Sequence, residues 1–448
     1  MASKDSEGRK VRILMIVENC PYLRDPRVRR EARTLVSAGY KVTVIAPNGD
    51  RQFLEEQTAD NVRVYRFVKL PSSSTIVGHL LEYLFAMVTI AIMSAYVFLR
   101  DGFDIIHVAN PPDGLVFIAS AYKVLGKSVI YDQHDLCPDL YAAKFGDSDD
   151  LIARILRLLE RLSFRLADAV IVTNESYKRL AMNRGRLDES VVTVVRNGPD
   201  HLNAKSGKID PQLRRAASYI LAFAGIMEIQ DGVEGLIRTL HALRYKLGRN
   251  DFLCIVMGSG HSLKGVKALT RDLGLEDNVQ FTGWISDREL YWSYLAASDI
   301  CLAPEPFNEY NDQSTFVKVM EYMAAGKPIA AFDLKETRFS AQQSALYAKR
   351  NSELEFARVI TKLMDDPGLR FTMGEAGRRL VQEKLAWQFS EPNLLKVYDL
   401  LASRYKRFQA GPELVAETKE NDDLLPLNVL PEAGLEEHIR YAKGAPRE

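Results

Sequence analysis

The sequence predicts an α/β protein built from two Rossmann-like domains, each with a doubly wound parallel sheet, that face one another across a cleft. Three observations lead to this fold class. The chain has 448 residues, which is more than one ordinary domain holds. Its composition, 47% apolar and 26% charged, is that of a globular protein. Short runs rich in Val and Ile alternate with helical periods, stop at a polar stretch, and then start again.

The first half of the chain contains seven strand-like runs, and helical segments lie between them. The runs are 11–17, 41–45, 62–67, 103–108, 128–131, 169–172 and 191–195. Helical spacing is found at 25–38, 76–99, 114–124 and 149–166. Gly39 ends the first of these helices as a C-cap. This alternation is typical of a parallel sheet with helices on both faces, so residues 1–200 are predicted to form the first domain.

The second half repeats the pattern after the turn signal Asn197-Gly198-Pro199-Asp200. The polar residues 201–216 are expected to be a linker. Strands are expected at 219–224, 252–257, 279–281, 300–303 and 328–331. Residues 217–388 then form the second domain. Residues 411–448 mix acidic residues, Pro and Gly without a sustained period, so we expect a flexible tail there.

Charge and cysteine content exclude several classes of protein. Lysine plus arginine and aspartate plus glutamate number 59 each, so the formal net charge is zero and nucleic acid is not an expected partner. The four cysteines are far apart and form no metal-binding pattern, which fits a reducing compartment and no structural zinc. Residues 1–10 lack the apolar run of a signal peptide. A cytoplasmic protein is therefore expected.

Two segments of the first domain raise the question of a membrane. Residues 83–99 are uncharged and reach the lower limit of transmembrane length, and they lie in the predicted helix 76–99. A buried helix is the first interpretation and contact with a bilayer is the alternative. A true span would separate the flanking strands. Arginines recur at spacings of three and four on one helix within 152–165: Arg154, Arg157, Arg161 and Arg165. They suit an anionic membrane surface or, alternatively, a solvated helix face.

An ordered set of motifs resembles the family 4 retaining glycosyltransferases. The longest motif, NDQSTFVKVMEYMAAGKPIA at residues 311–330, is similar to the donor-binding signature of that family. FAG at 223–225, VMGSG at 256–260 and VQFTG at 279–283 stand in the expected order, as do YDQHDL at 131–136 and RNG at 196–198. The resemblance covers residues 11 to 406. It implies the GT-B fold, with a nucleotide-sugar cleft between the domains and a C-terminal helix, 389–410, that crosses back to the first domain.

The resemblance also implies donor-binding residues in the second domain. Glu321 matches the glutamate that accepts hydrogen bonds from the ribose, although a solvated helix carboxylate is the alternative. Ser314 and Thr315 precede a predicted helix, whose first amides are suited to a diphosphate, and they also suit the helix as N-caps. Lys318 is expected to reach the phosphates or to be solvated. Gly225, Gly258, Trp284 and Arg196 complete the predicted donor site, with Trp284 beside the nucleobase or simply packed.

Two positions depart from the family pattern. The family often has a glutamate eight positions before Glu321, where this chain has Gln313, which we still expect to bind sugar hydroxyls. Many relatives carry an arginine and a lysine in the loop after the first strand of the second domain, where this chain has Ile226 and Asp231. The Gln-Asp-Gly version of this loop resembles a branch found among polysaccharide-biosynthesis enzymes. The charge of the leaving diphosphate must then be neutralised elsewhere, for which Lys318 and Arg196 are the first choices.

In the first domain, His134 directly follows a strand and matches a donor-contacting histidine of the family. A structural histidine is the alternative, and Asp135 is expected to orient the ring. We place His134, Glu321 and Lys318 in the catalytic group. The strand-end residues Asn19, His107, Asn110 and Asp113 are predicted on the acceptor side, although His107 equally suits a satisfied core position.

The function implied is retaining transfer of a sugar from a nucleotide-diphosphate sugar to a glycan. The acceptor is expected to be lipid-linked, in the biosynthesis of cell-surface polysaccharide on the inner face of the cell membrane. No metal or other cofactor is expected, because no Asp-x-Asp pair lies in a suitable loop. Two alternatives stay open. One is a GT-B enzyme with a soluble acceptor, and the other is a catalytically silent nucleotide-sugar-binding scaffold, which the substitutions at 226, 231 and 313 would favour.

Overall fold

The computed structural model describes residues 10–49, 54–70, 76–146, 149–200 and 217–410. The chain up to Ala402 forms one compact unit, and a second unit begins at Ser403. The predicted linker 201–216 and the predicted tail 411–448 lie outside the described residues.

The first domain contains an eight-stranded sheet in the order β3-β4-β2-β1-β5-β6-β7-β8. Its strands are β1 (Arg12–Val17), β2 (Lys41–Pro47), β3 (Glu55–Gln57), β4 (Arg63–Phe67), β5 (Ile105–Ala109), β6 (Ser128–Gln133), β7 (Ala169–Val172) and β8 (Val192–Val194). All neighbours are parallel except β3, which runs antiparallel to β4. The predicted doubly wound sheet is confirmed, with β3 as an added edge strand.

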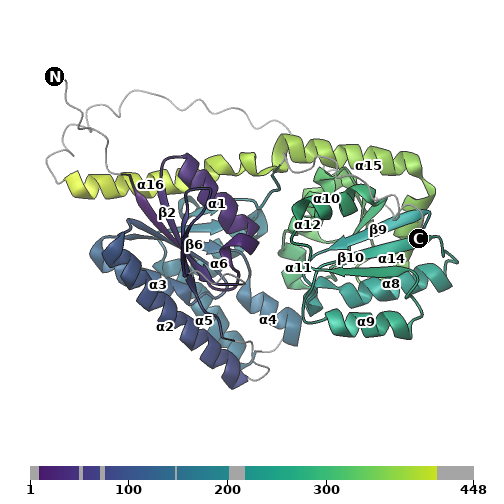
Figure 1. The fold of residues 1–448 in the computed structure, drawn as a ribbon, viewed down its shortest axis with the longest axis horizontal. Helices are drawn as coiled ribbons and strands as arrows, with labels where there is room; N and C mark the ends of the chain where they lie inside the picture. The colour runs from purple at the N-terminus through teal and green to yellow at the C-terminus, as the bar shows by residue number, and fades with distance from the viewer. Residues whose placement is uncertain (1–9, 50–53, 71–75, 147–148, 201–216, 411–448) are drawn as a thin grey trace, which may run out of the picture. The chain divides into compact units, whose positions relative to one another are not determined.

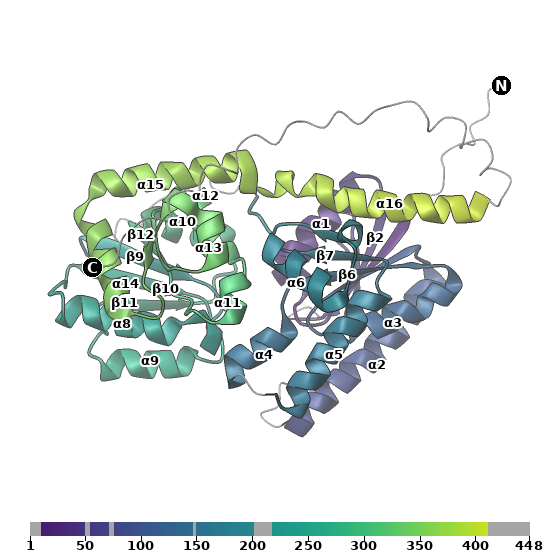
Figure 2. The same cartoon turned by 180° about the vertical axis from the view of Figure 1, so that it is seen from behind.

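Helices cover both faces of this sheet (Figures 1 and 2). One core layer holds residues of α2 (Ile76–Arg100), α3 (Leu115–Ala121), α5 (Leu151–Leu166) and α6 (Glu175–Gly185). The other holds residues of α1 (Pro26–Ser37) and α16 (Glu391–Ala410). The short helix α4 (Cys137–Phe145) follows β6. Asp25 caps α1 by accepting hydrogen bonds from the backbone amides of Arg27 and Val28, which fixes where this helix begins.

The second domain has a fully parallel six-stranded sheet in the order β11-β10-β9-β12-β13-β14. The strands are β9 (Tyr219–Ala224), β10 (Phe252–Met257), β11 (Val279–Gly283), β12 (Ile300–Ala303), β13 (Ile329–Phe332) and β14 (Ala345–Ala348). On one face lie α8 (Val233–Tyr245), α9 (Leu263–Asp272) and α14 (Glu353–Asp365), and on the other lie α10 (Arg288–Ala297) and α12 (Val317–Ala324). Three further helices are α11 (Glu309–Gln313), α13 (Lys335–Ala341) and α15 (Pro367–Leu380).

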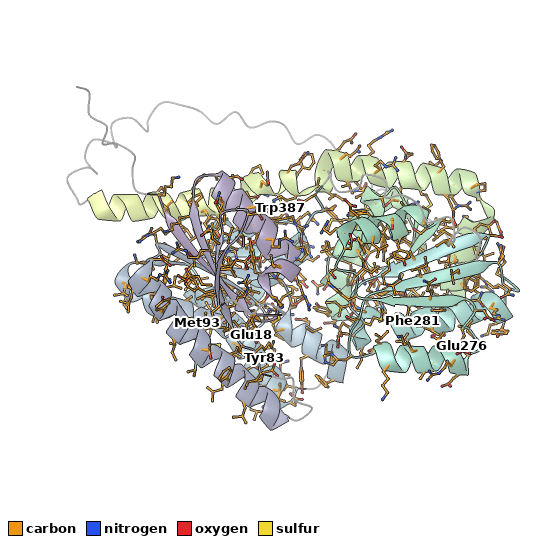
Figure 3. All side chains as sticks on the ribbon, in the orientation of Figure 1. Glu18, Tyr83, Met93, Glu276, Phe281 and Trp387 are labelled. Atoms are coloured by element: carbon orange, nitrogen blue, oxygen red, sulfur yellow. The ribbon has the colours of Figure 1, made fainter. Side chains whose placement is uncertain are left out.

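The chain then returns to the first domain, as predicted. After α15 and the turns at Val381–Leu385 and Trp387–Phe389, α16 begins at Glu391. Leu394, Val397, Tyr398 and Leu401 of α16 are buried in the same cluster as residues of β1 and β2. The indole of Trp387, labelled in Figure 3, donates a hydrogen bond to Thr34 Oγ1 of α1 at 2.9 Å. The crossing is therefore fixed by apolar burial and by a hydrogen bond.

Helix α2 is buried on one face only. Ala86, Ile90 and Val97 pack in the core of the first domain. The opposite side exposes a row of large apolar side chains, here called the apolar face of α2: Leu81, Tyr83, Leu84, Phe85, Val88, Ile92, Tyr96 and Leu99. Figure 3 shows the side chains of α2 as sticks that point outward from this helix. The prediction of a buried helix is right for the first face and wrong for the second, because the sheet covers only one side.

By length and composition, Leu81–Arg100 would be able to cross a membrane. Its mean hydropathy reaches 1.8, and only 28% of that window is buried within the protein. The exposed apolar side of α5 adds Leu151, Ile155 and Leu158 to the same domain. So large an exposed apolar area on this chain points to an interaction surface.

Candidate functional site

The carboxyl end of the second sheet is shaped by glycines. Gly225 and Gly258 follow β9 and β10 with φ of 155° and 135°. The amide of Gly225 donates to Met257 O at 3.0 Å, and the amide of Gly258 donates to Gly283 O at 2.9 Å. A Cβ atom on Gly258 would lie 1.8 Å from the carbonyl oxygen of Gly225. Only glycine permits the two backbone segments to approach so closely. The backbone polar groups of both turns therefore lie at the carboxyl ends of the strands, which is where open α/β sheets bind ligands.

Lys318 lies in the first turn of α12 and points at this glycine edge. Its Nζ atom is 2.6 Å from Glu305 Oε1 and 4.0 Å from Asp231 Oδ1. It also lies 4.4 Å from the centre of the Phe223 ring. A Cβ atom on Gly225 would approach Lys318 Nζ to 2.8 Å, so the ammonium group stands directly beside the turn. The alternative of a solvated lysine is wrong, since Lys318 is buried and ion-paired with Glu305.

Glu321 follows one turn later on the same helix. Its Oε2 atom accepts a hydrogen bond from the Tyr291 hydroxyl at 2.6 Å. Burial raises the pKa of Glu321, opposed by this hydrogen bond and by the charges of Arg288, Arg30 and Lys318. The other oxygen, Oε1, has no hydrogen-bond partner among the described residues. A half-buried carboxylate with one oxygen held and one free is suited to accept hydrogen bonds from a diol.

Asp231 and Ile226 occupy the loop positions where an arginine and a lysine were expected by resemblance. Ile226 is 56% exposed. Asp231 accepts a hydrogen bond from the backbone amide of Glu228, and burial raises its pKa to about 6, against the lowering effect of Lys318. With Glu305, two carboxylates therefore surround the single ammonium group of Lys318 in this part of the site.

Gln313, Ser314 and Thr315 form contacts between the two domains. Asn174 Nδ2 donates to Gln313 O at 2.9 Å and to Thr315 Oγ1 at 3.0 Å. The Ser314 hydroxyl bonds the Tyr177 hydroxyl at 2.9 Å and donates to Tyr310 O at 2.7 Å. Neither Ser314 nor Thr315 is an N-cap, since α12 begins at Val317 after Phe316, which makes no side-chain cap. These hydroxyls already have protein partners, so their phosphate contact stays a prediction.

His134 follows β6 at the carboxyl edge of the first sheet. Its Nε2 atom lies 2.6 Å from Asp132 Oδ2, and its side chain is 15% exposed. Arg27 donates to both oxygens of Asp132, at 3.0 and 2.7 Å. Burial disfavours the charged imidazole, but the Asp132 carboxylate outweighs it and raises the pKa of His134. The expectation that Asp135 orients the ring is wrong: Asp135 accepts instead from the Tyr310 hydroxyl at 2.7 Å.

The residues predicted on the acceptor side separate into one exposed and three buried positions. Asn19 is exposed after β1. His107 is fully buried, and its Nδ1 atom is 2.6 Å from the Tyr398 hydroxyl of α16. Contact with an acceptor is therefore closed to His107 in this structure, and the core alternative holds.

Asn110 and Asp113 support the loop that carries His134. The side-chain oxygen Oδ1 of Asn110 accepts from the backbone amides of His134 and Asp135 at 2.6 and 3.1 Å, and its Nδ2 atom donates to Asp113 Oδ1 at 2.8 Å. Asp113 also accepts from the Tyr131 hydroxyl at 2.6 Å. Both residues are buried, so they hold the strand-end loops in place rather than line a surface.

Arg196 follows β8 in the first domain, and Trp284 follows β11 in the second. The Arg196 guanidinium stacks 4.6 Å from the centre of the Phe339 ring of α13. Trp284 is 50% exposed after β11. Within the part of the chain that the structure describes, neither side chain has a hydrogen bond or ion pair with Lys318 or Glu321, so their donor roles remain predictions.

Sequence reasoning missed Asp132, Glu305 and Tyr291, which hold His134, Lys318 and Glu321 in place. The only sequence signal is a carboxylate at or just after a buried strand, as in Asp132 of β6 and Glu305 beyond β12. The spacing along the chain says nothing about these pairings, because they join separate elements.

The buried carboxylates Glu31 and Asp132 and the imidazole of His107 form a group whose ligand atoms lie within 4.8 Å of one another. Such a group has the ligand types of a metal site. The Arg27 guanidinium, however, is 2.7 Å from Asp132 and 3.1 Å from Glu31. It supplies the positive charge that these carboxylates need, and the Tyr398 hydroxyl engages the imidazole. The group therefore fits a structural ion-pair network better than a metal centre.

Comparison with known proteins places these features in a family. Residues 27–201 match the family model Glycosyltransferase Family 4, and residues 218–366 match Glycosyl transferases group 1. The chain is 23% identical over 374 residues to the uncharacterized glycosyltransferase MJ1069 of Methanocaldococcus jannaschii, which covers 81% of this chain and 91% of the relative. It is 28% identical over 188 residues to the lipopolysaccharide core biosynthesis glycosyltransferase LpsD of Rhizobium meliloti, which covers 41% of this chain and 49% of that relative.

Among solved structures, Anabaena Alr3699/HepE in complex with UDP-glucose has a similar fold, with a TM-score of 0.64. The match covers 87% of this chain and 99% of that chain at 17% identity.

Proposed function

Because the chain belongs to the family 4 glycosyltransferases, enzymes of the GT-B fold, we propose that it transfers a sugar from a nucleotide-diphosphate sugar to a glycan with retention of configuration. The observation that carries the proposal is the placement of Lys318 and Glu321, one turn apart on α12, at the glycine edge of the second sheet. An ammonium group beside a glycine turn and a carboxylate with a free oxygen suit the two polar parts of a nucleoside diphosphate.

Each group has a specific task in this proposal. Glu321 accepts hydrogen bonds from the ribose hydroxyls, and Lys318 neutralises the diphosphate as it leaves. The backbone at Gly225 and Gly258 allows the phosphates to approach closely. His134, held by Asp132, faces the donor sugar from the first domain. The acceptor hydroxyl attacks on the face that the diphosphate leaves, so stabilising the leaving group and positioning the acceptor supply the rate.

Lys318 is the main cation of the leaving-group site in this proposal, since Ile226 and Asp231 replace the basic residues of many relatives. In the absence of ligand Glu305 and Asp231 hold the ammonium group. A diphosphate would compete with Asp231, the more distant of the two partners. Because the protein supplies this positive charge itself, we propose that no metal ion is needed, and EDTA should then leave turnover unchanged.

We further propose that the acceptor is lipid-linked. The enzyme would then act at the cytoplasmic surface of the cell membrane, in the assembly of polysaccharide. The support is the apolar face of α2, together with the exposed apolar side of α5 and its exposed arginines Arg161 and Arg165. The other two arginines, Arg154 and Arg157, are ion-paired with Asp149. Apolar side chains next to basic ones are the combination that binds anionic bilayers. The match to a lipopolysaccharide core enzyme agrees with such an acceptor.

The first experiment is thermal unfolding with UDP, GDP and ADP. A nucleotide present at a hundred times its dissociation constant should stabilise the protein by about 2.7 kcal/mol. UDP is the first choice, since the similar Anabaena structure holds UDP-glucose. No shift with any of the three would contradict the donor site.

Turnover separates the enzyme from a silent scaffold. The matching UDP-sugars are incubated with membranes that contain lipid-linked sugars, and labelled product is measured. Product only with membranes supports the lipid-linked acceptor, and product without membranes supports the soluble one. A nucleotide shift without turnover on any acceptor would favour the scaffold.

A further inference from the structure

A cavity of about 550 Å³ lies beside α4, α5 and α6 of the first domain and the segment 307–310 of the second. None of the residues assigned to the donor lines it. Its volume is within the range of small-molecule sites, roughly 300–1,000 Å³. The polar and aromatic groups used below are Asp139, Glu160, Arg161, Arg184, Glu309 and Tyr310.

One side of the cavity is rigidly organised. Arg184 donates to both oxygens of Asp139 at 2.6 and 2.8 Å and to both oxygens of Glu160 at 3.2 and 3.3 Å. Gln133 Nε2 also donates to Glu160, at 3.2 Å. The Glu160 side chain is only 1% exposed, and its burial raises its pKa to about 7, against the effect of Arg184. Donors and acceptors are thus held in fixed positions on this side before any ligand arrives.

Two charged side chains of the lining lack protein partners among the described residues. Arg161 and Glu309 are exposed, and neither has a hydrogen bond or ion pair with another described residue. Tyr310 follows Glu309 in the chain, and its hydroxyl donates to Asp135 at 2.7 Å. Arginine provides donors and glutamate provides acceptors for a ligand that brings both kinds of group.

The charge of the lining indicates the class of ligand. Three arginines, Arg157, Arg161 and Arg184, are matched by three carboxylates, Asp139, Glu160 and Glu309. The balance does not favour a strongly anionic or cationic ligand. Alternating donors and acceptors beside the aromatic rings of Phe307 and Tyr310 suit the hydroxyl groups and the C–H faces of a saccharide.

The cavity lies between the loop of His134, which is proposed to face the donor sugar, and the exposed apolar side of α5, which is proposed to contact the membrane. Tyr310 bonds Asp135, the residue that follows His134, so the cavity adjoins the loop that carries this histidine. At about 100° per residue, Arg161 and Arg165 fall on the side of α5 next to Leu158 and Ile155. One edge of the cavity thus borders the exposed apolar side of α5.

We propose that this cavity is a subsite for the sugar units of the acceptor glycan, held by both domains at once. The inference rests on the proposed glycosyltransfer and names where the body of the acceptor binds. Arg161 and Glu309 bind the saccharide hydroxyls, and Arg184 with its two carboxylates forms the fixed wall.

Saturation-transfer NMR with maltotriose, chitotriose and mannotriose tests the subsite without requiring turnover. The proteins are the wild type, Arg161→Ala, and the control Arg165→Ala, which removes an exposed arginine of the same helix that does not line the cavity. We expect at least one trisaccharide to bind the wild type and the control equally, and Arg161→Ala to bind it about tenfold more weakly.

Failure of the subsite differs from failure of the proposed function. No saturation transfer with any trisaccharide, or equal binding by Arg161→Ala and the wild type, overturns the subsite. UDP-dependent thermal shifts of the same samples report on the donor site separately. A saccharide that binds through Arg161 in a protein that binds no nucleotide would keep the cavity as a saccharide site and overturn its role as an acceptor subsite.

Discussion

At the scale of single residues, the free oxygen of Glu321 decides whether the donor site binds a ribose. Glu321→Gln keeps the shape of the side chain and removes its charge. Hydrogen bonds to a charged group contribute about 1.5–3 kcal/mol, so the affinity for the nucleotide found in the unfolding experiment should fall roughly 10- to 100-fold by calorimetry. Tyr291→Phe, which removes only the hydroxyl 2.6 Å from Glu321, should have a smaller effect. Unchanged affinity in Glu321→Gln would exclude the ribose assignment.

The pairing of Lys318 with Glu305 allows stability to be separated from catalysis. Lys318→Met leaves Glu305, with a side chain 1% exposed, without its cation, and should lower the free energy of unfolding by about 3–5 kcal/mol. Adding Glu305→Gln removes the buried charge and should restore most of that stability in urea titrations. Turnover should stay low in both proteins, since the diphosphate has lost its cation. Wild-type turnover in the double variant would remove Lys318 from the proposed mechanism.

Protonation of His134 should make the free energy of unfolding depend on pH, with lower stability at higher pH. Its pKa is raised above the ordinary 6.5 because Asp132 outweighs the effect of burial, while Arg27 opposes the shift and Asp25 supports it. The folded state therefore binds the proton more tightly than the unfolded state. The stabilisation is complete below pH 6.5 and is lost as the pH rises through the higher folded value.

Urea unfolding of wild type and His134→Gln across this pH interval measures that contribution. The wild type should lose stability relative to the variant as the pH rises above 6.5. A constant difference between wild type and His134→Gln would mean that the Asp132 contact does not favour the charged imidazole.

At the scale of elements, the exposed side of α2 predicts binding to anionic vesicles. Leu84 and Ile92 are 60% and 65% exposed, and transfer of one such side chain out of water contributes roughly 1.5–3 kcal/mol. The variant Leu84→Glu/Ile92→Glu should therefore float with phosphatidylglycerol vesicles at least tenfold less than the wild type. Phe371→Glu, at a residue 73% exposed on α15 of the second domain, is the matched control. Equal flotation of all three proteins would refute docking through α2.

The sequence predicts elements well where burial imposes a pattern on it. The apolar runs of β1, β2, β6 and β9 are found in the structure close to their predicted bounds, since strands covered on both faces must be apolar throughout. β3 was missed because Glu55–Gln57 is a polar edge strand that pairs with only one neighbour. Helix α4 was missed because Cys137 and Pro138 begin it without a polar cap, directly after a loop.

The site shows the same division between local and tertiary information. Motif resemblance located His134, which the structure places directly after β6, and Lys318 and Glu321, which it places on α12. It did not reveal their partners, since Asp132–Arg27 and Tyr291–Glu321 join residues 105 and 30 positions apart. Nor did it show that His107 faces α16, because the crossing helix brings Tyr398 from 291 positions away.

At the scale of the whole molecule, the two passages of the chain between the domains meet. The amide of Trp387 on the returning passage donates to Pro199 O at 3.1 Å on the outgoing one. Nearby, Arg30 bonds Asn197 and lies 5.7 Å from the centre of the Trp387 ring. This junction and the contact of Ser314 with Tyr177 both join the domains, so the junction should influence how the halves of the site meet.

Gly198 allows the outgoing and returning passages of the chain to lie in contact. Its substitution tests whether this junction affects turnover at the proposed site. A Cβ atom at Gly198 would lie 1.9 Å from Leu385 O, so Gly198→Ala must push the two passages apart. Overpacking of this kind costs typically 1–3 kcal/mol, and turnover should fall as well, although every residue of the donor site is retained.

Gly235→Ala is the matched control, because a Cβ atom there would meet no atom within 4 Å inside α8, and helix propensity predicts a gain of about 0.5–1 kcal/mol with unchanged turnover. Urea unfolding and turnover are measured on both variants. If Gly198→Ala loses stability but keeps full turnover, the junction only holds the chain together. If turnover falls while nucleotide affinity is kept, the junction sets how the first domain, with His134, approaches a nucleotide that the second domain binds by itself.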